Sequence, residues 1–160
     1  MKAIFLDIDG VVCISKDACG PNTWLPELDR EAVILVDHLC QIDEAMTRIV
    51  ISSSWRLMFS KELLTDYLEK HGLAARFVHQ DWRTLAINNG SRGIEIQEWL
   101  GRHPEVADDF LIIDDRPSCD FLPNHQTRHV RTVSESGFRL ADFSKACLIL
   151  HGLTIRTLPI

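Results

Sequence analysis

The stretch IFLDIDGVV, residues 4–12, decides the fold, because it places two acids and a glycine directly after a short apolar run. The run has the Ile, Phe and Leu content of a strand that is buried on both faces. Side chains two residues apart on a strand point the same way. If the strand persists that far, Asp7 and Asp9 are therefore expected on one side, with roughly 6–7 Å of strand rise between them. Gly10 then allows the chain to turn closely.

Two further apolar runs resemble the first, and each also ends in polar residues. TRIVIS (47–52) leads into SSSWR (52–56), and DFLIID (109–114) is followed at once by Asp115. Both runs are rich in β-branched residues and have the length of buried strands. They predict two more core strands with polar carboxyl ends.

Helical patterns separate these runs. The expected helices cover 29–42, 60–72, 91–103 and 140–150, and two weaker strands are expected at 75–79 and 128–133. Strands that alternate with helices of this length predict an α/β fold, a three-layer α/β/α sandwich with a mainly parallel, Rossmann-like sheet. Ligands of such sheets bind beyond the carboxyl ends of the strands, which is where the polar residues gather.

The composition is that of an ordinary globular protein. The chain has 160 residues, 46% hydrophobic and 25% charged, so we expect a single domain over 1–160. Its net charge of −6 disfavours wide contact with a nucleic-acid backbone but does not exclude a short strand or a nucleotide. Five cysteines without a CxxC pair indicate a reduced protein without a zinc site. We expect a cytoplasmic protein with no membrane contact, because no leader or spanning run is seen.

The acids at the strand ends predict a magnesium site. Converging buried carboxylates repel one another unless a cation or a shared proton intervenes. Mg²⁺ prefers oxygen ligands and is commonly held by one or two carboxylates together with a substrate phosphate. The alternative is that Asp7 ends a strand, Asp9 caps a turn, and the pair Asp114–Asp115 is ordinary turn chemistry.

The second strand end and the third helix carry groups that suit a phosphate. The serines after residue 51 offer hydroxyl groups and backbone N–H groups just before a helix. The alternative is a simple helix cap, which needs only one serine. Arg92, at the start of the third expected helix, can offset phosphate charge, although an isolated arginine there is also typical of a solvated surface.

In this order, these motifs resemble those of the haloacid dehalogenase (HAD) superfamily of phosphohydrolases. The phrases ISSSWR, RGIEIQEWL and LIIDDR further resemble the small HAD domains of Swiss Army Knife RNA-repair-like proteins. The four motifs span residues 4–115, which is most of the chain. One departure is that the basic motif of the superfamily is more usually a lysine.

The resemblance implies a Mg²⁺-dependent phosphomonoester hydrolase. Asp7 would be the nucleophile that forms an aspartyl-phosphate, and Asp9 would act first as the acid and then as the base. Mg²⁺ would be held by Asp7, the backbone carbonyl of Asp9 and Asp114, with Asp115 in support. Superfamily members that only transfer phosphate can lack the second acid, so Asp9 favours hydrolysis.

The resemblance also assigns the phosphate-binding residues. Ser52 or Ser53, with neighbouring N–H groups, would bind the phosphoryl oxygens, and the triple serine leaves both open. Arg92 would neutralise charge on the transferring group.

The space for a cap domain indicates the substrate. Residues 13–28 can form only a small flap-like insert, so the site is expected to be open, with minimal or no cap. An open site suits a nucleotide or a nucleic-acid end, or a substrate held by a partner protein. The expected rim carries Trp24, Trp55, Arg56 and Trp82. These tryptophans can stack a base, although such residues often pack against the core instead.

Two other functions fit the same motifs. One is a phosphatase that acts on a small metabolite or a phosphoprotein. The other is a catalytically idle binding module that keeps the fold.

Overall fold

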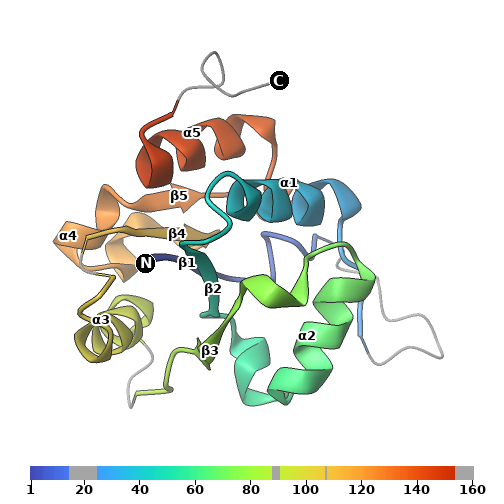
Figure 1. Ribbon diagram of the computed structural model, residues 1–160, viewed down its shortest axis with the longest axis horizontal. Helices are drawn as coiled ribbons and strands as arrows, with labels where there is room; N and C mark the ends of the chain where they lie inside the picture. Colours follow the sequence, from blue (N-terminus) through green and yellow to red (C-terminus); the bar gives the residue numbers. More distant parts are fainter. Residues whose placement is uncertain (15–24, 88–90, 107, 154–160) are drawn as a thin grey trace.

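The computed structural model describes residues 1–14, 25–87, 91–106 and 108–153. These residues form one parallel sheet with helices on both faces (Figure 1). The strands are β1 (Lys2–Leu6), β2 (Thr47–Ile51), β3 (Val78–Arg83), β4 (Phe110–Asp114) and β5 (His129–Arg131). The helices are α1 (Arg30–Gln41), α2 (Lys61–Lys70), α3 (Arg92–Arg102), α4 (Pro123–Gln126) and α5 (Leu140–His151). The predicted three-layer α/β/α fold is therefore confirmed.

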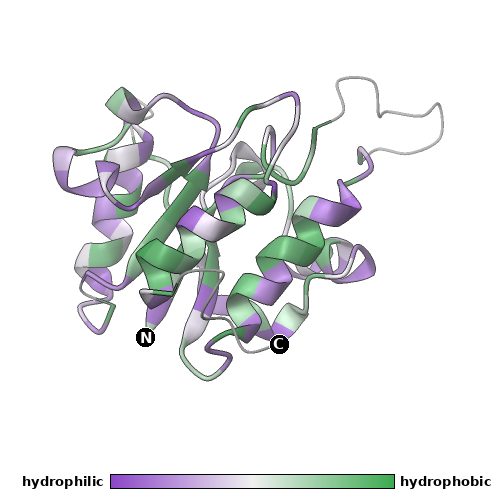
Figure 2. Cartoon of the chain, turned by 90° about the horizontal axis from the view of Figure 1, so that it is seen from above, coloured by the Kyte–Doolittle hydropathy of each residue, from purple (hydrophilic) through white to green (hydrophobic). Residues whose placement is uncertain are grey.

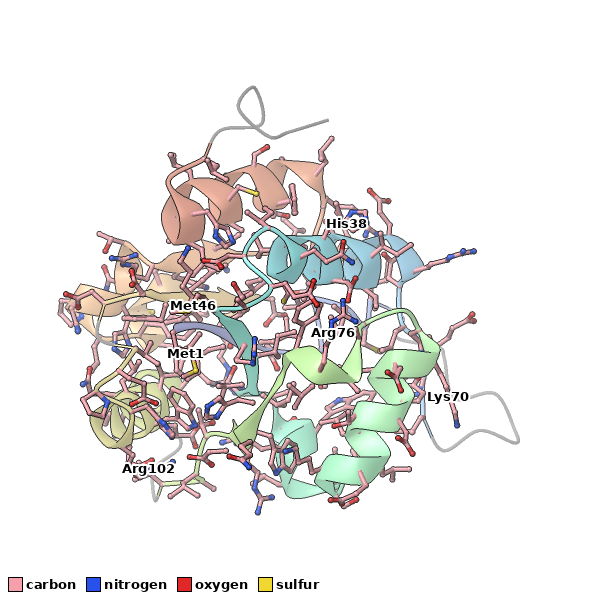
Figure 3. All side chains as sticks on the ribbon, in the orientation of Figure 1. Met1, His38, Met46, Lys70, Arg76 and Arg102 are labelled. Carbon is pink, nitrogen blue, oxygen red and sulfur yellow. The ribbon has the colours of Figure 1, made fainter. Side chains whose placement is uncertain are left out.

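The strand order is β3-β2-β1-β4-β5, and all the pairings are parallel. The chain builds the sheet outward from β1 on one side and then returns to add β4 on the other side. The order thus reverses between β1 and β4, and a crevice beyond the carboxyl ends of such strands is the usual ligand position. Met1 and Met46, labelled in Figure 3, directly precede β1 and β2 and mark the opposite, amino edge of the sheet.

Alternate side chains of the central strands enter two separate cores. On one face, Ile4 and Leu6 pack with α1, α2 and α5. On the other face, Ala3 and Phe5 pack against α3, where Trp99 meets the Phe5 ring edge-on at 5.3 Å. Figure 2 shows apolar residues along the strands and on parts of the helices. Burial on both faces explains why these strands have continuous apolar sequences.

The expected helices lie where the sequence places them, with ends shifted by one or two residues. Asp29 caps α1 by accepting a hydrogen bond from Ala32 N–H at 2.9 Å, and Ser60 caps α2 by accepting one from Leu63 N–H. Among the described residues, no helix combines the length and apolarity needed to cross a bilayer.

The expected strand at 75–79 is wrong. Residues Ala75–Phe77 form a 3₁₀ turn that buries Phe77, and the strand β3 begins only at Val78. β3 pairs irregularly with β2, since Ile49 faces Val78 whereas Ile51 faces Arg83. β3 is an edge strand, since it is the last strand on its side of the sheet. Most of the expected flap at 13–28 lies outside the described residues.

Candidate active site

The ends of β1 and β4 bring Asp7 and Asp114 together. Asp7 follows the last residue of β1, and its backbone N–H donates to the Ile113 carbonyl at 3.0 Å. Asp114 is the last residue of β4 and is fully buried. The parallel register of these two strands therefore places both acids at the same edge of the sheet.

Asp115 completes a cluster of three acids. Asp7, Asp114 and Asp115 each offer a carboxylate oxygen, and these oxygens lie within 4.8 Å of one another. Ser134, in the segment after β5, donates a hydrogen bond to Asp115 Oδ2 at 2.7 Å. A Cβ atom at Gly10 would lie 2.2 Å from that same oxygen, and Gly10 has a φ of +72°. Asp115 thus has its position because residue 10 lacks a side chain.

The environment of Asp114 raises the pKa of its carboxyl group. Its burial, followed by the charge of Asp7, raises its pKa from 3.8 to about 7, and Arg92 opposes this rise. Its Oδ1 accepts a hydrogen bond from Arg116 N–H at 2.9 Å. Its Oδ2 has no hydrogen-bond partner among the described residues. A buried carboxylate with a raised pKa and an oxygen that accepts no hydrogen bond is suited to a bound cation, which would stabilise its charged form.

Asp9 lies apart from the three clustered acids. The strand does not persist as far as Asp9, because β1 ends at Leu6, so the condition for placing Asp7 and Asp9 on one side of a strand is not met. The Ile8 carbonyl accepts hydrogen bonds from the N–H groups of Val11, Val12 and Cys13, and these bonds close a turn. The exposed Asp9 side chain accepts a hydrogen bond from Trp55. Burial raises the pKa of Asp9, the hydrogen bond from Trp55 lowers it, and the nearby charges of Asp7 and Asp115 raise it further.

The end of β2 supplies two buried serines with different roles. The N–H of Ser52 continues the β1 ladder by donating to the Leu6 carbonyl at 3.0 Å. The hydroxyl oxygen of Ser53 accepts a hydrogen bond from Trp55 N–H at 3.3 Å and so caps the 3₁₀ turn Ser54–Leu57. The Ser52 hydroxyl is buried and has no partner within the described chain. Both serines can therefore offer an O–H donor, because the oxygen of Ser53 only accepts in its capping bond.

Arg92 begins α3 and points its charge at the acids. Its guanidinium is 4% exposed, with Nη1 at 3.8 Å from Asp7 Oδ1 and Nε at 3.7 Å from Asp114 Oδ2. These distances give electrostatic attraction without a hydrogen bond. The helix start is held close to the chain after β4, because a Cβ at Gly93 would lie 2.8 Å from Leu122 N.

Three buried polar atoms of the site have no partner in the part of the chain that the structure describes. They are Ser52 Oγ, Arg92 Nη1 and Asp114 Oδ2, which come from β2, α3 and β4 respectively. Buried polar groups are rarely left unpaired. A carboxylate oxygen fits a divalent cation, whereas a guanidinium and a hydroxyl fit phosphate oxygens. The residues present therefore fit both a hard metal ion and a phosphoryl group.

The comparison with protein families agrees with this site. Residues 3–143 match the family described as the HAD domain in Swiss Army Knife RNA repair proteins. The chain belongs to this family. Membership indicates a hydrolase of the phosphatase type. No curated protein and no solved structure gives a significant match to this HAD domain.

The expected rim residues of the HAD domain are mostly not at a rim. Arg56 is 3% exposed, and its guanidinium pairs with Glu95. Trp55 is also buried, with its ring 5.5 Å from that of Phe59. Trp82 is half-buried on β3, and Trp24 lies outside the described residues. Arg56, named as a possible rim residue, is buried because its guanidinium turns inward toward Glu95 and the carbonyls at the strand ends.

Sequence reasoning missed the residues that follow β5. Thr132 donates a hydrogen bond to the Gly10 carbonyl at 2.7 Å, and Ser134 holds Asp115. No motif marks them, and the one signal was the expected strand at 128–133, which includes Thr132 and ends just before Ser134. The same segment borders a cavity of about 420 Å³ beside the acid cluster, lined by Asp115, Arg131, Thr132, Val133, Ser134 and Glu135.

Proposed function

We propose that this HAD domain is a Mg²⁺-dependent phosphomonoester hydrolase that works through an aspartyl-phosphate on Asp7. The observation that carries the proposal is the convergence of Asp7 and Asp114 with the unpartnered guanidinium nitrogen of Arg92. The acids suit a metal ion, and the buried guanidinium suits the negative charge of a substrate that binds together with that ion.

Asp7, Asp114 and Asp115 would hold the ion, with the backbone carbonyl of Asp9 as a further ligand. The bound ion would neutralise the phosphoryl oxygens and the carboxylates around them. Ser52 and Arg92 would bind the remaining phosphoryl oxygens, because each has a buried donor atom that finds no partner among the described residues. Ser53 would remain a second candidate, since its oxygen accepts the capping bond from Trp55 N–H and its own O–H can still donate to a phosphoryl oxygen.

The reaction would proceed in two balanced steps. In the first step, a carboxylate oxygen of Asp7 forms a bond to phosphorus while the bond to the leaving oxygen breaks and Asp9 gives that oxygen its proton. In the second step, Asp9 takes a proton from water as the water attacks the aspartyl-phosphate, which releases phosphate and restores Asp7. The raised pKa of Asp9 supports its role as the acid.

The substrate would be a nucleotide or the phosphorylated end of a nucleic acid. The family is described by its occurrence in RNA repair proteins. The cavity beside Asp115 offers about 420 Å³ for the group that leaves, and Arg131 lines it. The net charge of −6 suits contact with a chain end rather than with a long backbone.

Phosphate release tests this proposal. The purified chain with Mg²⁺ is given p-nitrophenyl phosphate, nucleoside monophosphates, a small phosphorylated sugar, a phosphopeptide, and oligonucleotides with a 3′- or 5′-phosphate. We expect hydrolysis of the oligonucleotide ends, no turnover by Asp7→Asn, and a kcat about 10²–10⁴-fold lower for Asp9→Asn. Asp66→Asn, an exposed acid on α2, is the control.

The intermediate has its own test. After acid quenching with a radiolabelled substrate, the wild-type chain should carry a label that hydroxylamine removes, whereas Asp7→Asn should carry none. Release from the sugar or peptide but not from oligonucleotides would overturn the substrate. An absence of release from every ester would overturn the hydrolase itself and favour a binding module.

A further inference from the structure

Arg56 makes a dense set of contacts just behind the candidate phosphate site. Its Nη1 donates to the carbonyls of Ser52 at 2.8 Å and Ser53 at 2.7 Å, and its Nε donates to the Thr84 carbonyl at 2.8 Å. Its Nη2 donates to Glu95 Oε2 at 2.8 Å. The two side chains are 3% and 7% exposed, so this is a buried ion pair.

These contacts join three segments that are far apart in the sequence. Ser52 and Ser53 follow β2, Thr84 follows β3, and Glu95 lies in the first turn of α3. Glu95 is three residues after Arg92, and residues at that spacing lie on neighbouring positions of one helix face. One guanidinium therefore links the backbone that carries the Ser52 hydroxyl to the helix that carries Arg92.

The chemistry of the link favours arginine in particular. A guanidinium has five donors in a fixed plane, whereas an ammonium is a compact charge on a flexible stem. Four acceptors surround Arg56 in the described structure. The carboxylate of Glu95 also balances one of two buried arginine charges, since Arg92 is buried nearby and faces Asp7 and Asp114 instead.

We infer that Arg56 and Glu95 are positioning residues, which set the Ser52 hydroxyl and the Arg92 guanidinium at the separation that one phosphoryl group requires. This inference rests on the proposed function, because it assigns those two groups to phosphate. Small errors of placement are costly in catalysis, since a displacement of about 1 Å can lower a rate by about 10²-fold.

The test uses two variants that keep every charge. Arg56→Lys removes the planar fork, and Glu95→Asp shortens the acid that reaches it. Arg139→Lys is the matched control, because Arg139 forms a two-point pair with Asp29 at 2.6 and 3.1 Å. That pair joins α5 to the start of α1, on the face of the sheet opposite α3.

The readouts are kcat and KM for p-nitrophenyl phosphate, the binding of inorganic phosphate followed by calorimetry, and thermal unfolding. We expect both site variants to weaken phosphate binding and to lower kcat, each by about 10-fold or more. Arg139→Lys should lower thermal stability while kcat and phosphate binding stay at the wild-type values.

A purely structural role gives a different result. If Arg56→Lys and Glu95→Asp lower the unfolding temperature but leave phosphate binding and kcat unchanged, the inference is overturned. Should Arg56→Lys not fold, Glu95→Asp alone decides the matter. Phosphate calorimetry distinguishes the two proposals. If the wild-type chain binds phosphate but hydrolyses no ester, the proposed hydrolase is refuted. The effect of Arg56→Lys and Glu95→Asp on phosphate binding then still tests the positioning role.

Discussion

The indole Nε1 of Trp55 donates a hydrogen bond to the carboxylate of Asp9 and lies 3.1 Å from both of its oxygens. This contact joins the turn after β1 to the turn after β2. A hydrogen bond to the charged form of an acid lowers its pKa, so Trp55 opposes the rise that burial causes at Asp9. Trp55, one of the rim residues that could stack a base, is therefore placed to tune the proposed acid.

Trp55→Phe should shift the pH dependence of hydrolysis to higher pH. Without the indole donor the pKa of Asp9 rises further, so its proton persists to higher pH. The falling limb of kcat/KM for an alkyl phosphate, whose leaving oxygen needs that proton, should shift to higher pH. Trp82→Phe, a half-buried change on β3, should leave the profile in place. A limb that moves to lower pH would contradict this account.

Asp114→Asn should stabilise the metal-free fold above neutral pH. Because the folded pKa of Asp114 is raised from 3.8 to about 7, the folded state holds the proton more tightly than the unfolded chain. In EDTA the wild type should therefore lose stability, relative to the variant, as the pH rises from about 4 to about 7. Above pH 7 the difference should be constant, and added Mg²⁺ should raise the unfolding temperature of the wild type alone. Asp109→Asn, an exposed acid just before β4, is the control in thermal scans, and a difference without pH dependence would refute the prediction.

Gly10→Ala should damage the acid cluster. The new Cβ would lie 2.2 Å from Asp115 Oδ2, and a φ of +72° is unfavourable for alanine. We expect a loss of about 1–3 kcal/mol in the free energy of unfolding and a higher Mg²⁺ concentration for half-maximal activity. Gly101→Ala in α3 meets no atom within 4 Å and should instead gain about 0.5–1 kcal/mol. Denaturant titration and a metal titration measure the two effects, and equal results for the two variants would disprove the assigned cause.

Arg131→Ala should raise KM for a phosphorylated oligonucleotide end and leave KM for a small phosphate ester unchanged. Arg131 lines the cavity beside Asp115, and its Nε donates to the Asp115 carbonyl at 3.2 Å. A guanidinium there can pair with the next phosphate of an oligonucleotide, so we expect KM for that substrate to rise about 10-fold. KM for p-nitrophenyl phosphate should not change. Arg128→Ala, at the amino end of β5, is the matched control. An equal rise of KM for both substrates would count against a leaving-group contact.

The fold and the acid cluster could be predicted because their signals are local. Apolar runs end in Asp7 and Asp114, and parallel strands necessarily bring such ends to one edge. β3 was misplaced because its start depends on the burial of Phe77 and on an irregular pairing with β2, neither of which is visible in a short window.

The parts of the site that depend on distant segments could not be predicted. Arg56 follows a serine run and so had the pattern of a rim residue, but its partner Glu95 lies 39 residues away in sequence. Ser134 contacts Asp115 across 19 residues without any motif of its own. The direction of Asp9 depends on the turn closed at the Ile8 carbonyl, which follows the end of β1 at Leu6 and is not visible in the strand pattern.

The close approach of Gly93 to the backbone of Phe121 and Leu122 has a consequence for selectivity. Because a Cβ at Gly93 would already meet this backbone, the start of α3 has no room to move toward the chain after β4, and we expect Arg92 to keep its position when a substrate binds. Tolerance for different substrates must then come from the opposite wall, around Asp115 and Arg131, where the chain leaves space. On the proposed function, the domain would be strict about the phosphate and permissive about the group to which the phosphate is attached.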